Sequence, residues 1–171
     1  MLKKNIEEAL NAQINAEMWS AYLYLSMSMD TFSKGFKGIA NWFKVQFLEE
    51  QAHAAIMINY LQAQNEKVTL APIAKVTTEW KDVLATFEDT LIHEQGVTKM
   101  INNLCDIAAK DNDYASQNFL AWFVDEQVEE EQNVRDLIFQ CKMADGNNAG
   151  MMLIDKELGA RVYQAPAPLK P

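Results

Sequence analysis

A glutamate and a histidine stand three residues apart, as Glu50 and His53, in a segment whose other residues have the spacing of an amphipathic helix. Side chains three residues apart on an α-helix lie on the same face. Apolar residues continue that face on both sides, so we expect Glu50 at a core position. A buried charge is strongly unfavourable unless it is paired or coordinates a metal. The pair is therefore a possible metal-ligand pair, and a metal site requires further donors from the rest of the chain.

Three other segments with helical spacing are each interrupted near the middle by polar residues. The interruptions are Glu17, Glu94, and Gln127 with Glu130. If four helices bring them to one level, several carboxylates face one another, which is unfavourable unless cations lie between them. A proton-sharing network or salt bridges would be the alternative, but no Lys or Arg lies on these apolar faces. The pattern favours metal binding.

The donor types narrow the choice of metal. Carboxylates dominate, with one imidazole and no thiolate near the expected level, which suits iron or manganese in a two-metal centre better than structural zinc. Glu50 lies between the other donors and is the natural bridge between two ions. We expect Glu17 and His53 to complete one site, and Glu94 to hold the second with Glu130 beside it.

Further acidic residues neighbour this centre in the sequence. Glu49, Glu126 and Glu129 could form an adjoining third metal site, although a solvated helix face is the commoner place for glutamate. We interpret Glu131 as a surface residue. Tyr24 lies two turns after Glu17 on the same face and is either a packed core tyrosine or a residue that acts at the metal.

Four long helices and a short one must position these residues. Sparse Gly and Pro and the apolar spacing predict helices over residues 4–31, 38–64, 78–109, 114–143 and 149–159. We expect the third helix to be capped by Thr77 or Thr78. The apolar fifth helix should pack on the end of the bundle or enter a subunit interface.

Residues 67–78 lack helical periodicity and contain Pro72. A single strand would have no pairing partner, so we predict an extended connection. About a dozen extended residues span the ~40 Å length of the preceding helix, which lets the second and third helices run parallel. The expected fold is an all-α four-helix bundle with one long crossover and a short fifth helix.

Length and composition limit the classes of function. The 171 residues suit one helical domain, residues 1–161, followed by a Pro-rich tail, 162–171, that we expect to be extended or disordered. A net charge of −9 argues against nucleic acid and anionic membranes as partners. We expect no signal peptide, and no apolar run reaches the length of a membrane span. Cys105 and Cys141 have no motif spacing, so we expect buried free thiols and a cytoplasmic protein.

Taken together, these residues resemble the non-haem bacterial ferritins. The resemblance covers nearly the whole chain. It is carried by Ala-Glu17-Met-Trp-Ser-Ala-Tyr-Leu-Tyr-Leu, Glu49-Glu50-Gln-Ala-His53, His93-Glu94-Gln95 and Trp122-Phe-Val-Asp-Glu126-Gln127-Val-Glu129-Glu130. It implies a ferritin-like bundle, a hollow shell of two dozen identical subunits, and oxidation of Fe(II) by dioxygen or hydrogen peroxide at a di-iron ferroxidase centre within each subunit, with the ferric mineral stored inside.

The resemblance also implies individual roles. The first iron would be held by Glu17, Glu50 and His53. The second would be held by Glu50, Glu94 and Glu130, with Gln127 nearby. A third iron would be held by Glu49, Glu126, Glu129 and Glu130. Tyr24 matches a tyrosine beside the centre.

Departures from related families exclude some functions. Bacterioferritins carry a second Glu-x-x-His, where this chain has Gln127-x-x-Glu130, and Ala52 replaces their haem-ligating Met; we therefore expect no haem. The chain length and fifth segment argue against the DNA-protecting mini-ferritins. Two alternatives to iron storage stay open. One is a rubrerythrin-like di-iron peroxidase, although its usual second Glu-x-x-His and Cys-x-x-Cys iron domain are absent. The other is a non-catalytic bundle with solvated acids.

Overall fold

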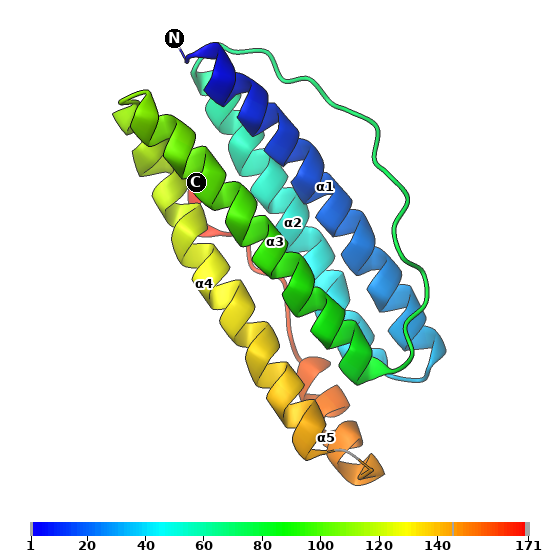
Figure 1. Ribbon diagram of the computed structural model, residues 1–171. Helices are drawn as coiled ribbons and strands as arrows, with labels where there is room; N and C mark the ends of the chain where they lie inside the picture. The colour runs from blue at the N-terminus through cyan, green and yellow to red at the C-terminus, as the bar shows by residue number, and fades with distance from the viewer. Residues whose placement is uncertain (1, 145, 170–171) are drawn as a thin grey trace.

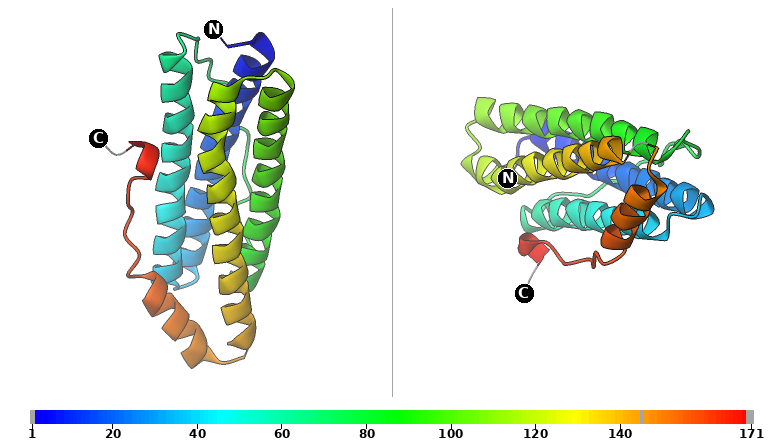
Figure 2. Two further views of the ribbon diagram at one scale, coloured as in Figure 1. Left: turned by 90° about the vertical axis from the view of Figure 1, so that its left-hand side faces the viewer. Right: turned by 90° about the horizontal axis from the view of Figure 1, so that it is seen from below.

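The computed structural model describes residues 2–144 and 146–169, and all regular structure in these ranges is helical. Four long helices form two antiparallel hairpins packed side by side, and a short fifth helix lies across one end (Figures 1 and 2). The elements are α1 (Lys4–Ser33), α2 (Lys37–Ala63), α3 (Val83–Lys110), α4 (Tyr114–Met143), α5 (Asn148–Leu158) and the 3-10 helix η1 (Ala167–Leu169). The predicted bundle with a fifth helix is confirmed.

The long connection between α2 and α3 contains no strand and runs along α1 to the other end of the bundle (Figure 1). Two side chains of α1 hold it there. Asn11 Oδ1 accepts the Thr69 amide at 2.7 Å, and Ser26 Oγ donates to the carbonyl of Thr77 at 2.7 Å. Because the connection crosses the full bundle, α2 and α3 run parallel, as predicted.

The start of α3 differs from the prediction. The helix begins at Val83 rather than near Thr78, and its N-cap is Asp82, whose carboxylate accepts the Ala85 amide at 2.8 Å. The residues just before Asp82 are held by tertiary contacts. The Trp80 carbonyl accepts Lys34 Nζ, and the Trp80 indole donates to Asp89 at 2.9 Å. These contacts override the threonine cap that the sequence offered.

The core consists of two apolar clusters at opposite halves of the bundle. The cluster near α5 is built around Tyr24, Phe43 and Phe87. The cluster toward the other end includes Leu10 and Ile101. On each of the four long helices, buried polar residues lie between the part that belongs to one cluster and the part that belongs to the other. The predicted interruption of each apolar face is therefore present in the structure.

Helix α5 docks on the first turn of α2 through an unusually close approach. A Cβ added to Gly38 would lie 1.6 Å from the Asp155 carbonyl oxygen, so only glycine fits. The Asp155 carboxylate caps α2 by accepting the amides of Gly38 and Ile39 at 2.8 and 2.9 Å. Ile154 is buried, whereas the neighbouring Leu153 is 66% exposed. The apolar face of α5 is thus only partly covered within one chain.

The chain then turns back from α5 along α2 and ends its described part in η1, which contacts α2 (Figure 2). Of the two free thiols, Cys141 is buried as expected, but Cys105 is only partly buried. None of the helices within residues 2–144 and 146–169 is long and apolar enough to cross a membrane.

Candidate metal centre

Glu17 of α1 meets Glu50 and His53 of α2 in the interior of the bundle. One ligand atom from each residue lies within 4.8 Å of the others, and no other acid, His or Cys side chains of the described residues form such a group of three. The three residues are at most 3% exposed. His53 Nδ1 is 3.6 Å from Glu50 Oε2. The Glu-x-x-His spacing and the Glu17 interruption therefore converge as predicted.

Two carboxylate oxygens of this group are buried without a hydrogen-bond partner: Glu17 Oε2 and Glu50 Oε2. The second oxygen of Glu17 is satisfied, since Gln13 Nε2 donates to Glu17 Oε1 at 2.8 Å. A buried unpaired acceptor is unfavourable by about 1–3 kcal/mol. A cation held between the two glutamates would satisfy both oxygens. The donor set, two carboxylates and an imidazole without a thiolate, fits iron.

A metal ion that binds Glu17, Glu50 and His53 would compete with protons bound to these side chains. Burial, followed by the charge of Glu50, raises the pKa of Glu17 well above its ordinary value. Burial also raises the pKa of Glu50, although His53 opposes the shift. Burial alone would lower the pKa of His53, yet the acceptors Glu126 and Glu50 raise it well above the usual value. The metal-free centre therefore retains protons that an entering cation would displace.

Glu94 of α3 supplies a third buried carboxylate, held from two sides. The Tyr24 hydroxyl donates to Glu94 Oε1, and Gln127 Nε2 donates to Glu94 Oε2 at 3.1 Å. The charge of Glu94 contributes to the raised pKa of both Glu50 and Tyr24, after the larger effect of burial on each. Glu94 thus belongs to the same electrostatic group as Glu50, and Tyr24 contacts it directly.

Glu130 of α4 is buried beside these residues and accepts a hydrogen bond from Gln46 Nε2 at 2.9 Å. Burial, then the charges of Glu94 and Glu49, raises the pKa of Glu130 to about 8. Glu130 is therefore mostly protonated near neutral pH in the metal-free protein. Like Glu17, it would release a proton on binding a cation.

The acidic residues around the centre have different partners and different degrees of exposure. Glu126 Oε1 lies 3.8 Å from His53 Nε2, and Glu49 Oε2 lies 2.6 Å from Arg161. Glu129 is exposed. Glu131, interpreted from the sequence as a surface residue, has a side chain only 17% exposed and is bonded by Thr98 and Arg135. Glu131 stays partly exposed, but the sequence did not predict that Thr98 of α3 and Arg135 of α4 would contact its carboxylate.

Sequence reasoning missed Gln13, Gln46 and Arg161. Gln13 donates to Glu17, and its sequence signal is its position one helical turn before that glutamate. Gln46 donates to Glu130, and its sequence signal is its position on the helix that carries the Glu-x-x-His pair. Arg161 lies after α5, outside the four long helices whose apolar faces carry no Lys or Arg. A cation that pairs with one of these acids therefore comes from outside the four long helices.

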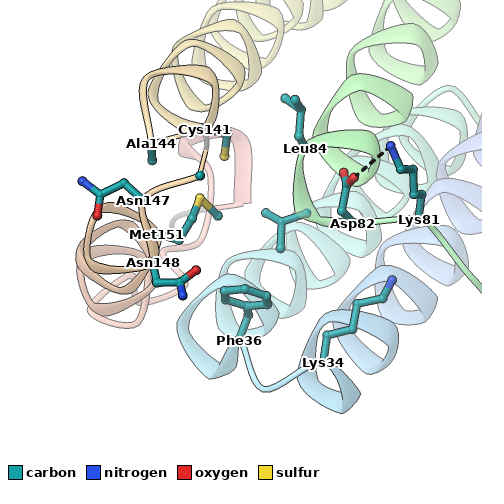
Figure 3. A pocket seen from close by; sticks show the side chains of 12 residues that line it. Lys34, Phe36, Lys81, Asp82, Leu84, Cys141, Ala144, Asn147, Asn148 and Met151 are labelled. Carbon is teal, nitrogen blue, oxygen red and sulfur yellow. Dashed lines mark ion pairs between the residues drawn. The ribbon is translucent and has the colours of Figure 1, made fainter.

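A separate cavity of about 400 Å³ lies at the end of the bundle, where the starts of α3 and α5 approach the end of α4. Figure 3 shows that its walls include Phe36, Leu84, Cys141 and Met151, with Lys81 and Asp82 paired at one side. None of the candidate metal-binding residues lines it. It is a gap left where α5 docks, distinct from the metal centre.

Known proteins share both this sequence and this fold. A family profile described as a ferritin-like domain matches residues 7–144. A bacterial non-heme ferritin of Bacteroides fragilis is 42% identical over 94% of this chain and 100% of the relative, and one of Staphylococcus aureus is 38% identical over 95% and 98%. An open pore ferritin from the archaeon Archaeoglobus fulgidus superposes with a TM-score of 0.94 at 40% identity, covering 95% of this chain and all of that one. The chain therefore belongs to the ferritin family and groups with the bacterial non-heme ferritins.

Proposed function

We propose that this chain oxidises Fe(II) at the centre formed by Glu17, Glu50 and His53 before the iron is stored. Iron storage follows from membership of the ferritin family. Oxidation at this centre is supported by one observation above the others: two buried carboxylate oxygens lack partners within a group whose ligand atoms lie 4.8 Å or less apart. Fe(II) is the substrate, and dioxygen or hydrogen peroxide is the electron acceptor.

The first Fe(II) binds Glu17, Glu50 and His53. Glu50 bridges to a second Fe(II) held by Glu94 and Glu130, with Gln127 and Tyr24 orienting Glu94. The raised pKa values of Glu17 and Glu130 support this assignment, since a group of carboxylates without a cation keeps protons. Binding Fe(II) displaces these protons and leaves a negatively charged, oxygen-rich site.

Such a site favours Fe(III) over Fe(II), because the more highly charged ion gains more from anionic oxygen ligands. Each Fe(II) gives up one electron, so a pair of ions reduces one hydrogen peroxide to two hydroxide ions. The buried surroundings, with Phe123 packed against the His53 ring at 6.0 Å, limit the access of water to the reacting ions. Haem is not required at any step.

The oxidised iron is stored in a hollow shell of two dozen copies of this chain in the cytoplasm. Exposed apolar side chains support self-association: Phe32 of α1 is 60% exposed, Phe139 of α4 63%, and Met152 of α5 71%. Isolated exposed apolar residues are common, but large ones on three helices of an otherwise acidic protein suit contacts between subunits.

Iron loading tests the function. Purified metal-free protein is given Fe(II) anaerobically and then dioxygen or hydrogen peroxide, and the soluble iron is counted per chain. We expect far more iron than the few ions that the centre can hold. If loading stops at two or three ions per chain, storage is contradicted and a di-iron peroxidase of the rubrerythrin kind takes its place. The particle mass, measured by light scattering, distinguishes a shell from a dimer.

A further inference from the structure

Arg161 is a cation that reaches the outer edge of the metal centre from the segment after α5. Its guanidinium lies 2.6 Å from Glu49 Oε2 and also donates to Gln46 Oε1. The side chains of Arg161 and Glu49 are only 25% and 19% exposed. The guanidinium further covers the ring of Trp42, at 5.0 Å from its centroid. Three kinds of contact therefore fix one side chain, which is more than a solvated surface pair would have.

Gln46 extends the influence of Arg161 to a second acid. While its Oε1 accepts from Arg161, its Nε2 donates to Glu130 Oε2 at 2.9 Å. Of the four residues that an adjoining third metal site would use, Glu49 is thus engaged directly and Glu130 through one amide. The Glu49 oxygen that faces the guanidinium at 2.6 Å is committed to Arg161, so a metal ion that used this oxygen would have to displace the guanidinium.

The docking of α5 determines where Arg161 lies. Asn41 Nδ2 donates to the main-chain carbonyl of Arg161 at 2.9 Å and to that of Leu158 at 3.3 Å. Asp155, one turn earlier, caps the first turn of α2. The backbone that leads to Arg161, and the Arg161 carbonyl itself, are consequently fixed relative to α2, which also carries Gln46, Glu49 and the metal-binding pair.

We propose that Arg161 is a positioning residue that takes the place of a cation beside Glu49 and so limits the centre to two tightly bound metal ions per chain. Its guanidinium neutralises Glu49 and, through Gln46, keeps Glu130 turned to the two-metal centre. A third ion beside Glu49 has to displace Arg161. This inference rests on the proposed two-metal centre and concerns the binding stoichiometry rather than the oxidation of iron.

Titration of the metal-free, fully assembled protein with Zn(II), which is not oxidised, tests the proposal by isothermal calorimetry. The Arg161→Gln variant should bind one more Zn(II) per chain than the unchanged protein. The Arg161→Lys variant keeps the positive charge and should bind the same number of Zn(II) ions per chain as the unchanged protein. Adding Glu49→Gln to Arg161→Gln should abolish the additional site, because the freed carboxylate is its ligand.

Lys142→Gln is the matched control, since Lys142 forms a surface ion pair with Glu88 at 2.9 Å and its loss changes the net charge by the same amount. An additional Zn(II) in this control, or none in Arg161→Gln, would overturn the proposal. If Arg161→Gln does not assemble, the assembled Arg161→Lys and Glu49→Gln variants decide: Zn(II) stoichiometry must stay unchanged in both. Fe(II) oxidation by the unchanged protein is measured separately, so the proposed function can fail or hold independently.

Discussion

Gln127 donates its side-chain amide to Glu94 twice, to the carboxylate Oε2 at 3.1 Å and to the main-chain carbonyl at 3.3 Å. The amide also approaches Thr98 Oγ1 at 3.3 Å. A glutamate at position 127 would bring a second carboxylate against Glu94, and an apolar residue would leave Glu94 without this donor. Gln127 therefore orients the carboxylate to which the second metal is assigned.

Replacing Gln127 by Leu should weaken the second metal site. Outer residues that orient metal ligands typically contribute about 10- to 100-fold to affinity. We expect a loss in that range for the weaker of two Zn(II) ions in a competition titration, while the tighter ion at Glu17 and His53 is retained. Equal affinity of the variant and the unchanged protein for both ions would contradict the role given to Gln127.

Replacing Tyr24 by Phe removes the hydroxyl that donates to buried Glu94. The ring of Tyr24 still packs on Phe43, 6.2 Å between centroids, so the variant should fold. Leaving a buried acceptor unpaired should reduce the stability of the metal-free protein by about 1–3 kcal/mol. Urea unfolding in the presence of a chelator measures it, and saturating Zn(II) should narrow the difference if Glu94 is a ligand.

Replacing Gly38 by Ala should detach α5 from the bundle, because the new Cβ would lie 1.6 Å from the Asp155 carbonyl oxygen. We expect the variant to lose the assembled shell in size-exclusion chromatography. Gly96 is the matched control: it lies within α3 and a Cβ there meets nothing within 4 Å. Gly96→Ala should assemble normally and gain about 0.5–1 kcal/mol from its higher helix propensity.

Metal binding should release protons near neutral pH. An ordinary glutamate is already ionised there, but burial and neighbouring charges raise the pKa of Glu130 to about 8, and the pKa of Glu17 is also raised. A raised pKa means that the folded, metal-free state holds the proton, which a cation then displaces. Zn(II) added to weakly buffered protein with an indicator dye should acidify the solution, more at pH 7 than at pH 9. Glu130→Gln should release fewer protons.

The sequence predicted the four long helices and the level of the metal centre because both follow from apolar spacing. The position of Glu50 within an apolar helix face can be recognised from the sequence alone. The same holds for Glu17 and Glu94 on two other helices. The long crossover was also predictable, since Pro72 and the lack of periodicity exclude a helix. These features depend on local sequence and on the reach of the chain.

Features set by tertiary contacts were not predictable. The first residue of α3 was placed too early because the contacts of Trp80 with Lys34 and Asp89 are invisible in the sequence. Arg161 was overlooked because it lies in a segment adjoining the Pro-rich tail, and only the docking of α5 brings it to Glu49. Helical periodicity predicts which residues face the core. It does not predict which side chains from distant parts of the chain contact them.

The most direct test of the central claim is the rate of Fe(II) oxidation in stopped-flow absorbance at two Fe(II) per chain. Glu50→Ala should oxidise Fe(II) at least about 100-fold more slowly than the unchanged protein, since a shared ligand contributes more than the roughly 10- to 100-fold of its outer partners. Glu88→Ala, at an exposed pair with Lys142, is the control and should leave the rate unchanged. Oxidation by a folded, assembled Glu50→Ala variant at the unchanged rate would contradict a ferroxidase centre at Glu17, Glu50 and His53.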